Sequence, residues 1–240
     1  MGKFIFDAAA TAAHFDYVNG IGSFGREYSV VYRGSDPFHY EATLDGQEGE
    51  VSFSSASLFI DCSKKDGAFV TVVKSGVSNF KVKDVMSADR IQCGIETVYR
   101  EEWLGDPQKP NHARILPIEP VIDNLKVFGE LHDFELPEPF LIKNRQREDY
   151  FQGKGETREP EGIAAAAAQI LPADGKTQIS ADRRGINNPK FGIVYFADWK
   201  WQEPCIHTPA KTAQWIQLVS LDVKNPGRGG GGGVGGNGTP

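Results

Sequence analysis

The stretch LFIDCSKKDGAFVTVV, from Leu58 to Val73, decides the fold class of this chain. Apolar and polar residues alternate on both sides of a central Asp66-Gly67 pair. Period-two alternation is typical of half-buried strands, and Asp-Gly supplies the positive φ that a hairpin turn requires. The stretch therefore predicts a β-hairpin. We expect Asp45-Gly46 to form a similar turn between Tyr40 and Val51.

Strand patterns continue along the chain. Between Arg90 and Arg100, alternate residues predict one apolar face. A longer run from Phe191 to Trp201 alternates in the same way, and Ala213 to Val223 is expected to pair with it as the next strand. The predicted face of the first run consists of Ile91, Cys93, Ile95, Thr97 and Tyr99.

These patterns predict a mainly β protein, an antiparallel sandwich or barrel with one or two short helices. We expect a single β-rich domain over residues 1–224, with residues 140–185 as a helical and loop insertion. Five alanines between Gly162 and Leu171 favour a short helix there. Nine of the last sixteen residues are glycine, so residues 225–240 are expected to form a disordered tail.

Composition narrows the function classes. The chain has 240 residues with 32 acidic and 26 basic side chains, a formal net charge of −6, which disfavours nucleic acid as a partner. Three scattered cysteines predict neither a disulfide framework nor a zinc site, and no cofactor is expected. The sequence shows no signal peptide and no apolar stretch long enough for a membrane helix, so we expect a cytoplasmic protein and leave non-classical export open.

Catalytic candidates are few. Cys205 and His207 stand two residues apart in a proline-flanked loop, a spacing that would suit a thiol and its base, or half of a metal site, but that is common by chance. His132 is a further candidate for proton transfer, together with a distant carboxylate, and Asp198 is a candidate group of a β-barrel enzyme. The usual nucleotide, zinc-protease and serine-hydrolase motifs are absent from the sequence.

Tryptophans are the candidates for ligand binding. Trp199 and Trp201 alternate on a predicted strand and could stack against a ligand, although the same alternation is more typical of a core. Trp103 follows Glu101-Glu102 in a predicted charged loop, and we expect it to be exposed and available for contact.

Four segments resemble an uncharacterised group of bacterial proteins of the same β-rich type. They are DVMSADRI (residues 84–91), DNLKVFG (residues 123–129), FGIVYFA (residues 191–197) and the terminal glycine run. Where that group carries a His-Pro step after the glycine, this chain has Glu130-Leu131. The resemblance implies bacterial origin and a common β fold, and it assigns no activity or functional residue.

Three functional hypotheses remain from the sequence. The first is a non-enzymatic binding or protein-interaction module on a β scaffold, with an unknown protein or small-molecule partner and possible homo-oligomerisation. The second is a small-molecule hydrolase or isomerase in a β-barrel. The third is a membrane-active, toxin-like protein that inserts the segment from Gly162 to Leu171.

Overall fold

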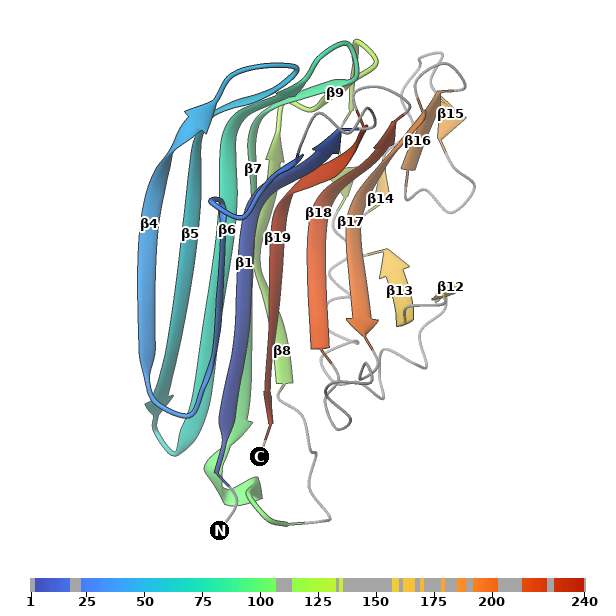
Figure 1. Ribbon diagram of the computed structural model, residues 1–240. Coiled ribbons are helices and arrows are strands. Elements are labelled where there is room, and N and C mark those ends of the chain that lie inside the picture. The colour runs from blue at the N-terminus through green and yellow to red at the C-terminus, as the bar shows by residue number, and fades with distance from the viewer. Residues whose placement is uncertain are drawn as a thin grey trace.

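The computed structural model describes residues 3–17, 23–106, 114–132, 134–135, 157–159, 162–166, 169–170, 178–179, 185–188, 192–202, 213–223 and 227–239. It is mainly β with antiparallel pairing, as the sequence predicts (Figure 1). In the described part of the chain, the one helical element is the 3₁₀ turn η1 (Glu101–Trp103).

A seven-stranded sheet, here sheet B, contains the predicted hairpin. Its strand order is β10-β9-β7-β6-β5-β4, and β8 pairs with β7. The hairpin turn at Asp66-Gly67 has positive φ at both residues, 50° and 72°, so the Asp-Gly prediction is confirmed. The strands are β4 (Phe38–Gln47), β5 (Val51–Lys65), β6 (Ala68–Val82), β7 (Met86–Arg100), β8 (Arg114–Asp123), β9 (Lys126–Val127) and β10 (Glu130–Leu131).

A ten-stranded sheet, here sheet A, lies against sheet B. Its main path is β12-β13-β17-β18-β19-β1-β2; β3 pairs with β1, and β16 pairs with β15 and β17. The strands are β1 (Ile5–Tyr17), β2 (Ser23–Phe24), β3 (Ser29–Gly34), β12 (Thr157–Glu159), β13 (Gly162–Ala166), β15 (Gln178–Ile179), β16 (Gly185–Asn188), β17 (Gly192–Gln202), β18 (Ala213–Val223) and β19 (Gly227–Thr239). A short pair, β11 (Phe134–Glu135) with β14 (Gln169–Ile170), stands apart.

Three expectations about local structure have different outcomes. The predicted pairing of residues 191–201 with residues 213–223 is confirmed by β17 and β18. The helix expected between Gly162 and Leu171 is wrong, because β13 and β14 occupy the described part of that segment. Pairing of β13 with β12 and β17 satisfies its backbone and overrides the high helix propensity of alanine. Residues 140–156 of the expected helical and loop insertion lie outside the described residues.

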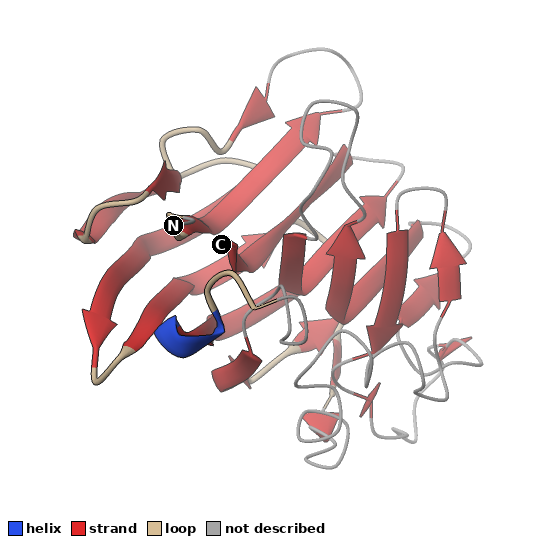
Figure 2. Cartoon of the chain, turned by 90° about the horizontal axis from the view of Figure 1, so that it is seen from below, coloured by secondary structure: helices blue, strands red, loops and turns tan. Residues whose placement is uncertain are grey.

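The glycine-rich segment differs from the expected disordered tail. Gly227–Thr239 forms β19, which pairs antiparallel with β1 on one side and with β18 on the other. Ladders on both sides provide hydrogen bonds that offset the large backbone entropy loss of glycine. Because Ile5 pairs with Thr239, the two ends of the chain lie close together in both views (Figures 1 and 2).

The core lies between the two sheets, and aromatic rings close one end of it. Phe4 stacks on Phe69 of β6 with ring centroids 4.3 Å apart, and it also contacts Tyr99 of β7 at 5.2 Å. Tyr99 meets Trp103 edge to face at 5.5 Å. The face predicted for residues 90–100 is confirmed, because all five of its residues are buried: Ile91, Cys93, Ile95, Thr97 and Tyr99.

In each central strand of sheet B (β5, β6 and β7), the alternation of buried and outward residues shifts by one position, and the three shifts lie side by side across the sheet. Odd-numbered positions are buried on one side of this level and even-numbered positions on the other, so each strand has two consecutive outward residues there. A strand keeps the same face inward through such a change only if its backbone departs locally from regular pleating. The buried sets are Val51 and Phe53, then Ala56, Leu58 and Ile60 in β5; Val73, Ser75 and Val77, then Phe80 and Val82 in β6; Met86 and Ala88, then Ile91, Cys93 and Ile95 in β7.

We call the residues at this level the switch row: Ser54, Asn79 and Asp89. The flanking pairs of the ladders place Ser54 opposite Asn79, and Asn79 opposite Asp89. Asn79 has a φ of 53°, and its side-chain amide donates to Ser54 Oγ at 3.0 Å. Ser54 Oγ in turn donates to the carbonyl of Ser78 at 3.2 Å. Asp89 accepts a hydrogen bond from the side-chain amide of Asn124 at 2.7 Å instead. The switch row therefore crosses neighbouring strands at a level where the ladder pairs 54–79 and 79–89 are interrupted.

Sheet A changes alternation at the same level. In β1 the buried residues pass from Ala10 and Ala12 to Ala13 and Phe15. Phe15 stacks on Phe24 at 6.3 Å, and Phe24 reaches Phe53, which lies beyond the switch row in β5, at 6.2 Å. The two sheets therefore bend together and keep one continuous core, as the curved upper ends of the strands in Figure 1 show.

The turn expected at Asp45-Gly46 is wrong. Both residues lie inside β4, and the chain turns at residues 48–50 instead. Gly46 lies opposite Ser54 of the switch row, because the pairs on either side of it join Asp45 to Ser55 and Gln47 to Phe53. A Cβ at Gly46 would lie 1.9 Å from the Phe53 carbonyl oxygen, so glycine is needed there for close strand approach rather than for a turn.

We predict that Gly46→Ala lowers the free energy of unfolding by about 3 kcal/mol, because the added methyl group meets backbone atoms that cannot move aside. The matched control is Gly67→Ala in the hairpin turn, where a Cβ meets no atom within 4 Å and only the positive φ opposes alanine. It is expected to cost about 1 kcal/mol. Urea denaturation measures both, and equal losses would contradict the close approach of β4 and β5.

Candidate functional site

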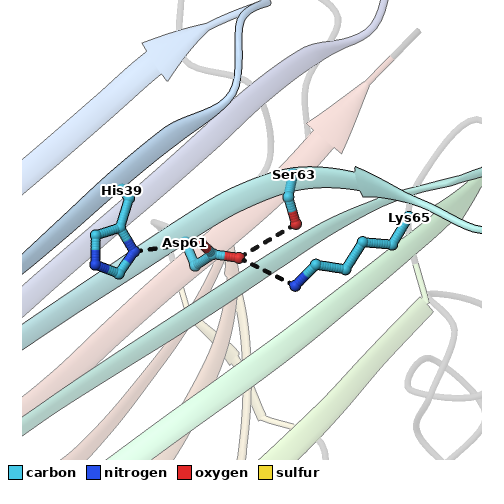
Figure 3. A network of polar contacts seen from close by, with 4 residues as sticks. All are labelled: His39, Asp61, Ser63 and Lys65. Carbon is cyan, nitrogen blue, oxygen red and sulfur yellow. Dashed lines mark hydrogen bonds and ion pairs between the residues drawn. The ribbon is translucent and has the colours of Figure 1, made fainter.

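A polar network lies on the outer face of β4 and β5, and Asp61 is at its centre (Figure 3). His39 Nδ1 lies 3.3 Å from Asp61 Oδ1. Ser63 Oγ donates a hydrogen bond to Asp61 Oδ2 at 3.2 Å, and Lys65 Nζ lies 3.7 Å from the same oxygen. Side chains from two neighbouring strands therefore converge on one carboxylate.

Strand pairing brings this network together. His39 is the direct cross-strand partner of Asp61 in the β4–β5 ladder. Ser63 and Lys65 follow Asp61 at intervals of two residues, so all three side chains point to the same face of β5. His39 also packs edge to face on Phe59, which is the preceding residue on that face, with ring centroids 5.5 Å apart.

The geometry of the network does not activate a nucleophile. In a serine-hydrolase triad the serine hydroxyl donates to the histidine, and the carboxylate orients that histidine from its other side. Here Ser63 and His39 both contact the carboxylate of Asp61, on different oxygens. The side chains of His39 and Lys65 are 60% and 65% exposed, so water competes for each of these contacts. The network presents donors and charge to the solvent.

The sequence analysis does not identify this network. The signal that could have found it is the register of the β4–β5 hairpin. A turn at Asp45-Gly46 places His39 beside other residues, whereas the observed turn at residues 48–50 places it beside Asp61.

The catalytic candidates from the sequence lie in different parts of the chain. His132 is buried next to the short β9–β10 hairpin of sheet B, and its backbone N–H donates to the Leu125 carbonyl at 2.9 Å. Asp198 belongs to β17 of sheet A, opposite Gln217 of β18. Cys205 and His207 lie outside the described residues, and so does the loop that joins them.

The binding candidates are placed as follows. Trp103 is buried, 8% exposed, which corrects the expectation of an exposed contact residue. The 3₁₀ turn η1 folds back over the end of β7, so Trp103 packs on Tyr99 while the neighbouring glutamates stay at the surface. Trp199 and Trp201 take alternate positions in β17, opposite Ile216 and Gln214 of β18.

Two cysteine thiols, those of Cys62 and Cys93, are buried in the core. Burial raises the pKa of Cys62 to about 12, and the negative charges of Asp61 and Asp7 act in the same direction, against a hydrogen bond with Thr71. Burial also raises the pKa of Cys93 to about 12, against a contact with Ser75. The nucleophile is the thiolate, so raised pKa values keep both groups unreactive.

Metal clusters and membrane helices do not occur in the described part of the chain. Within the described ranges, no three His, Cys, Asp or Glu side chains are grouped so that they could hold a metal ion. No helix among the residues with described placement is long and apolar enough to cross a membrane.

We predict that Cys62 and Cys93 resist alkylation by iodoacetamide at pH 8 in the folded chain. At a pKa of about 12 the thiolate is only about one part in ten thousand at that pH. Both should react readily once urea unfolds the chain. Peptide mass spectrometry separates them from Cys205, and rapid labelling of either thiol in the native protein would contradict its burial.

Comparison with curated proteins found no match, and comparison with solved structures found none either. A family match covers residues 39–184, which is more than half of the chain and includes β5 to β10, the Asp61 network and the switch row. The chain belongs to the family described as Domain of unknown function (DUF8256).

Proposed function

We propose that this protein is a non-enzymatic protein-interaction module, and that partners bind along the side of the sandwich where β3 and β4 lie. The observation that carries this proposal is that each of these two strands has one edge without a partner strand in the described part of the chain. In the described part of the chain, β3 pairs only with β1, and β4 pairs only with β5. Each strand thus has one edge on which its backbone groups are available to an added strand.

Side chains on the same side of the molecule support the proposal. Val31 of β3 is 71% exposed, so an apolar side chain lies at the surface of this edge strand. Tyr32 of β3 stacks on Phe38 of β4 with ring centroids 4.1 Å apart and planes 1° apart, so the two edge strands are held together at one end. The Asp61 network lies on the adjacent outer face.

The chemistry of the described side chains favours binding over turnover. Both described thiols are buried with raised pKa values, and the hydroxyl of Ser63 donates to the Asp61 carboxylate and not to His39. The two open edges are surrounded by hydrogen-bond donors and acceptors and by one exposed valine. Such a surface suits an extended peptide segment, because backbone hydrogen bonds provide affinity and side chains provide specificity.

We predict that Val31→Glu weakens the binding of extended peptides. Ligands would be selected from a random library of displayed peptides of about ten residues on the immobilised full chain, since open edges accept strands. Fluorescence polarisation then compares the wild type with Val31→Glu and with the matched control Leu131→Glu, another exposed large apolar residue at 55% exposure. We expect at least about tenfold weaker binding for the first variant and an unchanged affinity for the second.

Hydrogen exchange adds a second readout. Peptide binding should slow amide exchange within residues 29–47, because added hydrogen bonds protect edge amides. Equal binding by both variants would contradict the proposed surface. Hydrolysis of an ester or amide panel by the wild type, lost in Asp61→Ala, would favour an enzyme instead.

A further inference from the structure

The edge of β4 carries a pattern of charges that is complementary to itself. Its exposed positions are His39, Glu41, Thr43 and Asp45, and its half-buried positions alternate with them. β4 is the terminal strand in the order of sheet B. When two copies of one strand pair antiparallel around a two-fold axis, the register decides which residues of the two copies face each other. The charges along β4 can therefore be used to compare the possible registers.

Three registers with the axis near the middle of β4, at Glu41, Thr43 or Ala42, overlap by seven, nine and nine residues and keep outward residues beside outward residues. An axis at Leu44 also overlaps by seven residues, but it brings no opposite charges together. Centring the axis on Glu41 places the two Glu41 carboxylates opposite each other. Centring it on Thr43 places Glu41 opposite Asp45 twice. Like charges directly opposed on a sheet are destabilising, so both arrangements are disfavoured.

The third register centres on Ala42 and has no such conflict. It places His39 opposite Asp45 and Glu41 opposite Thr43, each pair occurring twice by symmetry. On the half-buried face it places Tyr40 opposite Leu44, also twice, so each copy would cover apolar surface of the other. One register therefore combines charge complementarity, apolar contact and a nine-residue overlap from Phe38 to Gly46.

We propose that the partner of the β4 edge is a second copy of this chain, paired antiparallel across β4 with its two-fold axis at Ala42, so that the two seven-stranded sheets become one. This inference rests on the proposed function and names the partner of one of its two strands. A contact through single strands buries little area, which makes the dimer a weak one. The acidic residues select its register and disfavour the neighbouring registers.

The test uses Thr43→Glu in the full chain, studied by sedimentation equilibrium over a range of concentrations. This variant places a new carboxylate opposite Glu41 of the second copy at two symmetric positions, and we expect it to weaken self-association by about tenfold. Position 43 is exposed and lies opposite Ser57 in its own sheet, so the fold should tolerate the change. Gln92→Glu in β7 is the control for the same change in net charge.

A compensating variant tests the register itself. In Glu41→Lys combined with Thr43→Glu, each introduced lysine faces an introduced glutamate of the other copy, and self-association should return to the wild-type level or above. Raising the salt concentration should reduce the difference between the variants. Restoration by the double variant is specific to the axis at Ala42.

Three results would overturn the proposal. They are a wild-type chain that stays monomeric at all concentrations, a dimer that Thr43→Glu leaves unchanged, and a loss that the double variant fails to restore. Peptide binding that depends on Val31 would persist in each of these cases if the interaction module itself is right, so failure of the dimer is distinguishable from failure of the proposed function.

Discussion

The architecture depends on one local constraint: along the switch row, neighbouring strands shift their alternation of buried and outward residues at the same level. Two hairpins, β4–β5 and β6–β7, extend well beyond this level, and a regular strand would turn its apolar residues outward when the sheets bend. Irregular residues at Ser54, Asn79 and Asp89 absorb the change, while the ladders continue in the same register on both sides. β1 makes the matching change at Ala12-Ala13, so the core stays closed.

The surface features follow from that arrangement. Because the strands of sheet B stay in register through the bend, the outer face between the switch row and the Asp66-Gly67 turn is continuous, and His39 meets Asp61 there. The close approach at Gly46 holds β4 on β5 to its end and leaves its other edge as the boundary of the sheet. The proposed binding surface is thus a consequence of how the sandwich bends, and it needs no separate pocket.

The sequence predicted the fold class, the 58–73 hairpin, the apolar face of β7 and the β17–β18 pair, because each depends on local alternation or on one turn. It failed where a distant segment decides the outcome. Pairing with β17 makes β13 a strand, and pairing with β1 and β18 orders the glycine-rich β19. The Asp61 network was missed because a turn placed too early gives the wrong register, and burial of Trp103 depends on the fold-back of η1.

The switch row is tested most directly by replacing Asn79 with glycine and with valine and comparing their free energies of unfolding. At a regular strand position valine is more stabilising than glycine, since branched side chains suit the pleated backbone. At the positive φ of Asn79 the order should reverse, because glycine adopts this conformation freely and valine is strained. We predict that Asn79→Gly is the more stable variant by at least about 1 kcal/mol. A more stable Asn79→Val would contradict the switch row and the bend built on it.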